Sequence, residues 1–163
     1  MSPLRTFLRM SAFLLLVSLS WGQNSTGNLP ATESFSGMYT FLKDGEFVQI
    51  TVEDAGRVTG FISRYGDGES DRGAFLDQFF KEGKLDSGKL SFSTQTVHGV
   101  WFDFKGTAER GEGRTPSDDA YHVLKGTLTE YRTDTNGKPS SQSRTVTFKS
   151  FPQDLGSPAP HRD

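Results

Sequence analysis

Carboxylates recur at alternate positions in the acidic segment around residue 69. Asp67, Glu69 and Asp71 are spaced as in the first half of an EF-hand calcium loop. Such a loop also needs glycine at its sixth position and glutamate at its twelfth, where this chain has Arg72 and Gln78. We therefore interpret the segment as a solvated acidic loop, and the sequence predicts no metal site.

Two histidines, His98 and His122, fall among the predicted strands. His98 with Asp103, or His122 with Asp118 and Asp119, could meet across strands as an acid–base pair, although neither has metal-ligand spacing. The chain has no cysteine, no G-x-S-x-G nucleophile motif and no glycine-rich phosphate loop. The sequence therefore predicts no catalytic residue and no cofactor. Of the functions considered below, an enzyme is the one that the sequence favours least.

The elements that must position these side chains are short segments in which apolar and polar residues alternate. Turn sequences separate them, among them Asp44-Gly45 and Asn136-Gly137, which favour tight hairpins. Residues 75–81 could also form a helical turn, but Phe79-Phe80 before a glycine favours a strand. The predicted strands are residues 37–42, 47–53, 57–65, 75–81, 89–96, 100–110, 121–133 and 143–151.

Sequential strands joined by short turns predict an all-β fold, a single antiparallel up-and-down (meander) barrel of about eight strands. Closure into a barrel removes the exposed sheet edges, and glycines inside strands mark the bends that closure needs. Gly106 and Gly126 share the context Lys-Gly-Thr twenty residues apart, which suits neighbouring strands that bend at matching points. A β-sandwich is the alternative.

The alternation also assigns side chains to the two faces of the sheet. Phe61, Trp101 and Tyr121 fall on the outer face, where aromatic rings among polar neighbours predict an interface and hence a homodimer. The loop of residues 66–85 could instead fold over the same patch. The residues predicted to face inward are Val48, Ile50, Ile62, Leu90, Phe92, Val100, Phe102, Phe104, Leu124, Leu128, Val146 and Phe148.

The first residues have the features of an export signal. Arg5 and Arg9 accompany an apolar run, residues 10–19, that is too short to span a bilayer. Cleavage after Ser20 or after Gly22 satisfies the small-residue rule, so we expect a bacterial periplasmic or secreted protein with no membrane span after cleavage. The predicted divisions are a signal peptide at 1–22, a flexible leader at 23–34, the β-barrel domain at 35–152 and a disordered tail at 153–163.

Charge and composition exclude several classes of partner. Without the two signal arginines the chain has 16 basic and 20 acidic residues, a net charge of −4. A mildly acidic chain lacks the basic stripe of a nucleic-acid-binding protein, and no basic amphipathic helix is present for membrane adhesion. Only 33% of the residues are hydrophobic, but 14 are phenylalanine, which fills a core with few side chains.

Three segments in the first third of the barrel, residues 37–39, 47–52 and 56–61, carry a resemblance. In order, they contain Gly-x-aromatic, a hydrophobic strand, and a glycine turn followed by a Thr-Gly strand. This order resembles the opening of avidin-like barrels. Lipocalin-like barrels also open with a similar motif, Gly-x-Trp. The resemblance implies a small-ligand barrel. Biotin binders of this family line their site with several tryptophans, whereas Trp101 is the one tryptophan of the predicted barrel and points outward, so the ligand-binding residues stay unknown.

Three functions follow from this interpretation. An exported barrel could bind a small, mostly apolar ligand in its mouth, since eight-stranded barrels can hold one such molecule. A barrel filled by its phenylalanines would instead act through its surface, as an interaction or structural module. An enzyme is the third. A cavity of about 300 Å³ or more with convergent polar groups would favour ligand binding.

Overall fold

The computed structural model describes residues 34–69, 71–134 and 136–153. The predicted signal peptide lies outside them, as do the leader except Ser34 and the tail except Gln153. One short 3-10 turn, η1, spans Asp54–Gly56, and no helix of the described residues is long and apolar enough to cross a membrane. The strands are β1 Gly37–Thr40, β2 Phe47–Val52, β3 Val58–Tyr65, β4 Phe75–Asp86, β5 Lys89–Thr94, β6 Val100–Arg110, β7 His122–Thr133 and β8 Pro139–Lys149.

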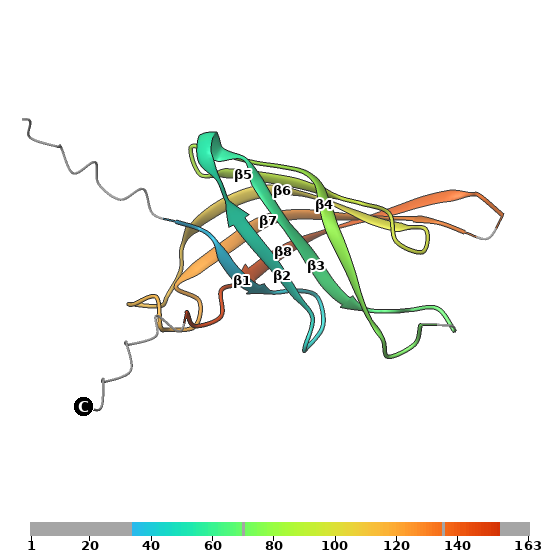
Figure 1. Ribbon diagram of the computed structural model, residues 1–163, viewed down its shortest axis with the longest axis horizontal. Helices are drawn as coiled ribbons and strands as arrows, with labels where there is room; N and C mark the ends of the chain where they lie inside the picture. The colour runs from blue at the N-terminus through green and yellow to red at the C-terminus, as the bar shows by residue number, and fades with distance from the viewer. Residues whose placement is uncertain (1–33, 70, 135, 154–163) are drawn as a thin grey trace, which may run out of the picture. The chain divides into compact units, whose positions relative to one another are not determined.

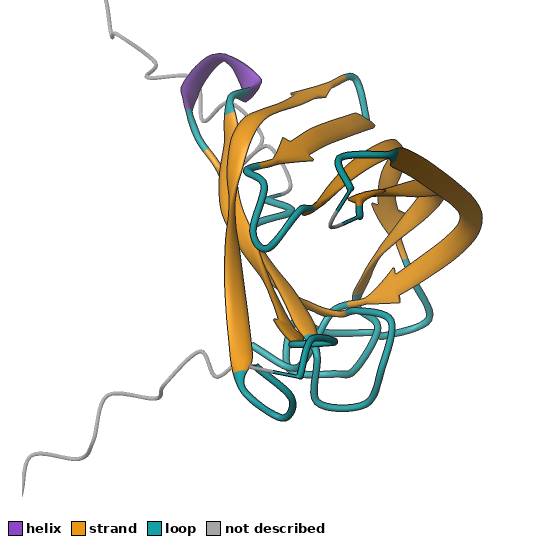
Figure 2. Ribbon diagram, turned by 90° about the vertical axis from the view of Figure 1, so that its right-hand side faces the viewer, coloured by secondary structure: helices purple, strands orange, loops and turns teal. Residues whose placement is uncertain are grey.

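Each strand pairs antiparallel with the next, in the order β1 to β8 (Figure 1). This order confirms the predicted all-β meander, whereas a sandwich would divide the strands between two packed sheets. Figure 2 shows how the sheet curls round on itself. Its first and last strands meet at a bridge between Tyr39 and Ser150, beside which Lys149 N–H donates to Thr40 Oγ1 at 3.0 Å.

Closure of the barrel is confined to one end. β1 has 4 residues and β8 has 11, so β1 lies only beside the C-terminal end of β8. In the described residues no strand pairs with the earlier part of β8 on the side away from β7. The barrel is therefore closed near Tyr39 and open beyond Thr40.

Aromatic rings fill the closed part. Phe92 stacks between Phe80 and Phe104, with ring centroids 4.3 Å and 5.2 Å away, and Phe148 lies 5.9 Å from Phe104. Eleven of the twelve residues predicted to face inward are buried, and Val146 is partly buried against them. The face assignment from alternation is confirmed.

The two glycines predicted to lie at matching points of neighbouring strands do so. Gly106 of β6 lies directly opposite Gly126 of β7. A Cβ added to Gly106 would stand 2.1 Å from the carbonyl oxygen of Lys125, closer than atoms can approach. Two long strands therefore come together where neither carries a side chain.

Two strand boundaries differ from the prediction by four or five residues, and the other differences are of one or two residues. β4 continues past Lys81 because a bulge between Phe80 and Glu82 resets its register, and Gly83 then packs against the carbonyl oxygen of Val58. β8 begins at Pro139, before the predicted residue 143. Its first residues are polar, so no apolar alternation marks them as a strand in the sequence. They form a strand because they pair with β7.

Candidate functional site

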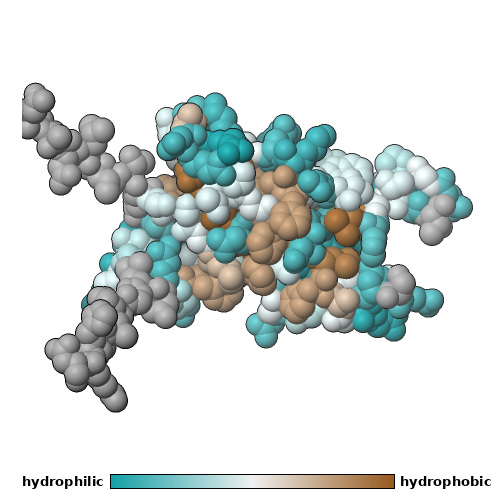
Figure 3. All heavy atoms as spheres, in the orientation of Figure 1, coloured by the Kyte–Doolittle hydropathy of each residue, from teal (hydrophilic) through white to brown (hydrophobic). Residues whose placement is uncertain are grey.

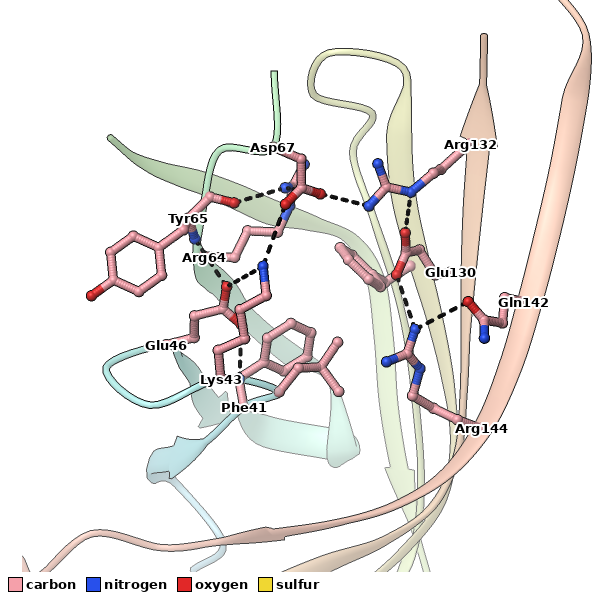
Figure 4. A pocket seen from close by; sticks show the side chains of 12 residues that line it. Phe41, Lys43, Glu46, Arg64, Tyr65, Asp67, Glu130, Arg132, Gln142 and Arg144 are labelled. Atoms are coloured by element: carbon pink, nitrogen blue, oxygen red, sulfur yellow. Dashed lines mark hydrogen bonds and ion pairs between the residues drawn. The ribbon is translucent and has the colours of Figure 1, made fainter. Parts of the chain in front are cut away.

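A cavity of about 400 Å³ opens at the unclosed end of the barrel (Figure 4). Phe41 and Phe102 contribute its apolar wall, with ring centroids 5.5 Å apart in an edge-to-face contact. Most of the other lining residues are charged. One group comes from the β1–β2 turn, β3 and the β3–β4 loop, and it faces a second group on β7 and β8.

The β7–β8 hairpin extends beyond the rest of the sheet (Figure 1). Side chains alternate along a strand, so the face that buries Leu128 in the closed part continues outward as Glu130 and Arg132 on β7. On β8 the same face presents Arg144 and then Gln142, which lies opposite Glu130. The hairpin therefore places a polar row over the cavity.

Glu130 occupies the centre of this row. Its side chain is only 10% exposed, and one carboxylate oxygen is paired with Arg132 Nε. The other oxygen accepts from Arg144 Nη2 at 3.4 Å. One largely buried carboxylate thus holds two guanidinium groups at the cavity.

Arg64 is a buried cation at the base of the opposite side. Its Nε donates to Gln78 Oε1 at 2.5 Å, and Gln78 Nε2 in turn donates to the carbonyl of Val100 at 2.9 Å. The guanidinium also lies 5.8 Å from the centre of the Phe102 ring. Burial lowers the pKa of Arg64 from its ordinary value. These contacts use Arg64 to fasten three strands together.

Asp67, in the β3–β4 loop, links the two sides of the cavity. Its carboxylate accepts from Arg132 Nη2 at 2.6 Å and from Lys43 Nζ at 3.4 Å, and it lies 3.6 Å from Arg64 Nη1. The hydrogen bond from Arg132 lowers the pKa of Asp67 and raises that of Arg132. The loop therefore docks on the barrel through a charge network.

Glu46 belongs to the turn rather than to the open surface of the cavity. The side chain is buried, and its two oxygens accept the backbone N–H groups of Lys43 and Tyr65, each at 3.1 Å. This carboxylate ties the β1–β2 turn to the end of β3.

No protein-family model matches the sequence, and no curated protein matches it. Rhizavidin matches the structure with a TM-score of 0.55 at 13% identity, over 76% of this chain and 87% of rhizavidin. A rhizavidin–biotin complex gives 0.52 at 14% identity, over 71% and 98%. Apo short afifavidin gives 0.51 at 14%, over 72% and 96%. This chain has the avidin-like barrel fold. The resemblance inferred from the three opening segments is thereby confirmed for the fold.

The three aromatic residues predicted as an interface are half-buried, and each has a partner in its own chain. Phe61 packs against Phe47 and Phe79 with ring centroids 5.8 Å and 5.5 Å away. Trp101 stacks on its cross-strand neighbour Tyr131 at 5.0 Å, outside the barrel as predicted. Figure 3 shows hydrophobic side chains gathered on the face where Figure 1 has β2, β3 and β4 in front.

Tyr121, the third residue of the predicted interface, contacts residues that lie outside that hydrophobic face. The Arg110 guanidinium stands 3.3 Å from the centre of its ring, and the ring also contacts His122. The prediction of an interface is not tested by these contacts.

One histidine contacts the acidic loop, and the sequence did not indicate this pairing. His98 Nδ1 lies 2.6 Å from Asp71 Oδ2, whereas Asp103 accepts from Ser93 Oγ at 2.7 Å. His98 is thus paired with the β3–β4 loop and not with Asp103. Across the described residues no group of three or more His, Cys, Asp or Glu side chains is arranged to hold a metal.

The sequence analysis missed the residues that line the cavity, although a signal for them exists. Arg64 follows the inward Ile62 by two positions, and Glu130 follows Leu128 in the same way. Arg144 precedes Val146 by two. Extending the inward face past the last apolar residue of each strand identifies all three.

Proposed function

We propose that this protein binds a small polar molecule in the cavity at the open end of its barrel. The observation that carries the proposal is the cavity itself. Its volume, about 400 Å³, lies in the range of small-ligand sites, and side chains from both edges of the sheet converge on it. Because the barrel is unclosed there, a ligand can enter without the strands separating.

The charged lining changes the kind of ligand expected. The sequence favoured a mostly apolar molecule, but a ligand without polar groups would separate Lys43, Arg132 and Glu130 from water without replacing their hydrogen bonds. Phe41 and Phe102 still offer one apolar wall. A molecule with an apolar part and a strongly polar part therefore suits the cavity best.

Biotin, which the rhizavidin complex contains, is the obvious first molecule to test because the fold is shared. The resemblance implied a site lined by tryptophans, whereas Trp101 stacks on Tyr131 on the outer face of this barrel. We therefore expect biotin to bind weakly or not at all, and calorimetry with the purified protein would measure this.

We also propose that the protein acts outside the cytoplasm, where its export signal would direct it. The proposed function is tested by native mass spectrometry of the protein purified from its own host. We expect a fraction of the protein to carry one additional small mass.

A Gln142→Trp variant, purified in the same way, provides the control. The indole would occupy the cavity from β8, where a large aromatic residue is compatible with a strand. Loss of the added mass in this variant supports binding at the mouth. An added mass that persists unchanged would place the ligand elsewhere, and wild-type protein without any added mass would contradict a tightly retained ligand.

A further inference from the structure

We infer that the ligand carries an oxyanion, a carboxylate or phosphate group, which is bound at the β7–β8 side of the cavity by Arg144 together with Arg132. This inference rests on the proposed function. It concerns the chemical class of the ligand, for which the lining residues give specific evidence.

The first support is the balance of charge that faces the cavity. Glu46 is occupied by backbone N–H groups and Arg64 by its buried contacts. The remaining cations are Lys43, Arg132 and Arg144, whose side chains are 60%, 45% and 38% exposed. They face two carboxylates, Asp67 and Glu130. The accessible lining therefore has one positive charge in excess, which a single anionic group would neutralise.

The second support is that the hydrogen-bonding capacity of Arg144 is largely unused. Its Nη2 makes two contacts of 3.4 Å, one to Glu130 and one to Gln142, both near the limit for a hydrogen bond. Its buried Nε has no partner among the described residues. A buried unpaired N–H group is costly, and a small rotation of the 38% exposed Arg144 side chain would present its Nε and Nη groups to the cavity as the fork that binds both oxygens of a carboxylate or phosphate.

Glu130 and Asp67 keep the two arginines in place for this role. Glu130 contacts both guanidinium groups, and Asp67 holds Arg132 from the opposite side at 2.6 Å. Guanidinium groups that are already positioned lose little conformational entropy when an anion binds. We therefore treat Glu130 as a positioning residue and Arg144 as the principal contact.

The apolar wall completes the description of the ligand. Phe41, Leu42 and Phe102 line the cavity together with the charged residues. A molecule that places a short apolar segment against these side chains and an oxyanion on Arg144 would use both surfaces. The class predicted is a small amphipathic acid.

Isothermal titration calorimetry with three probes tests the inference. The probes are 4-phenylbutyrate, phenyl phosphate and the neutral 4-phenylbutyramide. We expect at least one acid to bind with a Kd of about 1 mM or tighter, and the amide to bind at least tenfold more weakly. The two acids distinguish a carboxylate from a phosphate preference.

Variants identify the residue responsible. Arg144→Gln should weaken binding of the acid by about tenfold to a hundredfold, the range expected for a charge-assisted hydrogen bond. Arg144→Lys keeps the charge but removes the fork, so we expect an intermediate loss. Arg114→Gln removes the same charge from an exposed loop outside the cavity and should leave binding unchanged. Thermal unfolding of each variant verifies that it is folded.

The possible outcomes separate this inference from the proposed function. If acid and amide bind equally and Arg144→Gln has no effect, the oxyanion site is contradicted while a ligand-binding cavity stands. If Arg114→Gln weakens binding as much as Arg144→Gln, the attraction is a general effect of net charge and the site is again contradicted. If neither acid binds, the inference fails, and the retained mass in native mass spectrometry decides the proposed function separately.

Discussion

Glu130 shows at the scale of single residues why the mouth of this barrel needs a functional explanation. A carboxylate that is 10% exposed lies between two guanidinium groups, which costs desolvation that apolar side chains of similar volume would avoid. Such a network adds little to stability, and the closed part of the same barrel is packed with phenylalanine. The binding of a polar ligand that we propose would account for the charges at this end of the barrel.

Asp67 provides a prediction about pH. Its pKa is lowered from 3.8, mainly by the hydrogen bond from Arg132, so the folded state favours the carboxylate more than the unfolded chain does. Its contribution to stability is therefore present above the ordinary pKa and is lost as the pH falls through the lower, folded value. We expect Asp67→Asn to lower the melting temperature at pH 7 and to have a decreasing effect below about pH 4.

Melting temperatures of wild type and variant between pH 7 and pH 2 measure this difference. The same substitution in an Arg132→Gln background should show a smaller dependence on pH, because the principal partner is gone. A difference between wild type and Asp67→Asn that stays constant over the whole range would show that Arg132 does not perturb this carboxyl group.

At the scale of elements, the sequence predicted those strands whose apolar residues face the core. On β6, for example, Val100, Phe102 and Phe104 repeat at period two because one face of the strand is buried, and that pattern is local to the strand. The extension of β4 through Gly83 depends on contact with β3, and the start of β8 depends on pairing with β7. Contacts between distant segments leave no periodic signal in either segment.

The charged cavity escaped prediction for a related reason. Arg64, Glu130 and Arg144 continue the inward face of their strands, but a search for apolar residues ends each inward face before reaching them. Pairing between β7 and β8 and the partial closure by β1 bring these residues around one opening. The sequence indicates the face on which each residue lies, whereas the site arises from the way the sheet curls.

The facing glycines of β6 and β7 give a prediction at this scale. Gly106→Val would place side-chain atoms against the Lys125 carbonyl and separate the two strands, so we expect a loss of about 1–3 kcal/mol in the free energy of unfolding, or failure to fold. Urea denaturation measures this loss. Gly137→Asn is the control. Its left-handed turn conformation tolerates asparagine, and in the described residues an added Cβ would meet no atom within 4 Å beyond its chain neighbours, so a change under about 0.5 kcal/mol is expected. Equal effects would argue against close contact at Gly106.

At the scale of the whole barrel, the two ends differ in chemistry. The end closed by the Tyr39–Ser150 bridge is apolar and filled, and the open end is charged and hollow. The features expected for the two leading predicted functions, a hollow mouth and a filled interior, therefore occur in different parts of one barrel. The outer face carries further apolar side chains, among them Phe75 and Phe79.

The predicted homodimer belongs to that outer face. Phe75 and Phe79 on β4 are 51% and 54% exposed, and Phe79 adjoins Phe61, one of the predicted interface residues. We expect light scattering at about 100 µM, well above a micromolar Kd, to give the mass of a dimer, and Phe79→Ser to give a monomer. Met38→Ser, which alters an exposed apolar residue on β1, should remain dimeric. A monomeric wild type would contradict the homodimer.

The most direct test of ligand binding at the mouth is a proton–nitrogen correlation spectrum that resolves the Arg Nε–H signals during titration with 4-phenylbutyrate. We predict a large downfield shift of the Arg144 Nε–H, which has no partner in the described structure, and a smaller shift for Arg132, while Arg114 stays in place. Backbone signals of Phe41 and Phe102 should shift in parallel because they line the same cavity. An unchanged Arg144 signal, with shifts confined to the outer residues Phe61 and Phe79, would contradict the account.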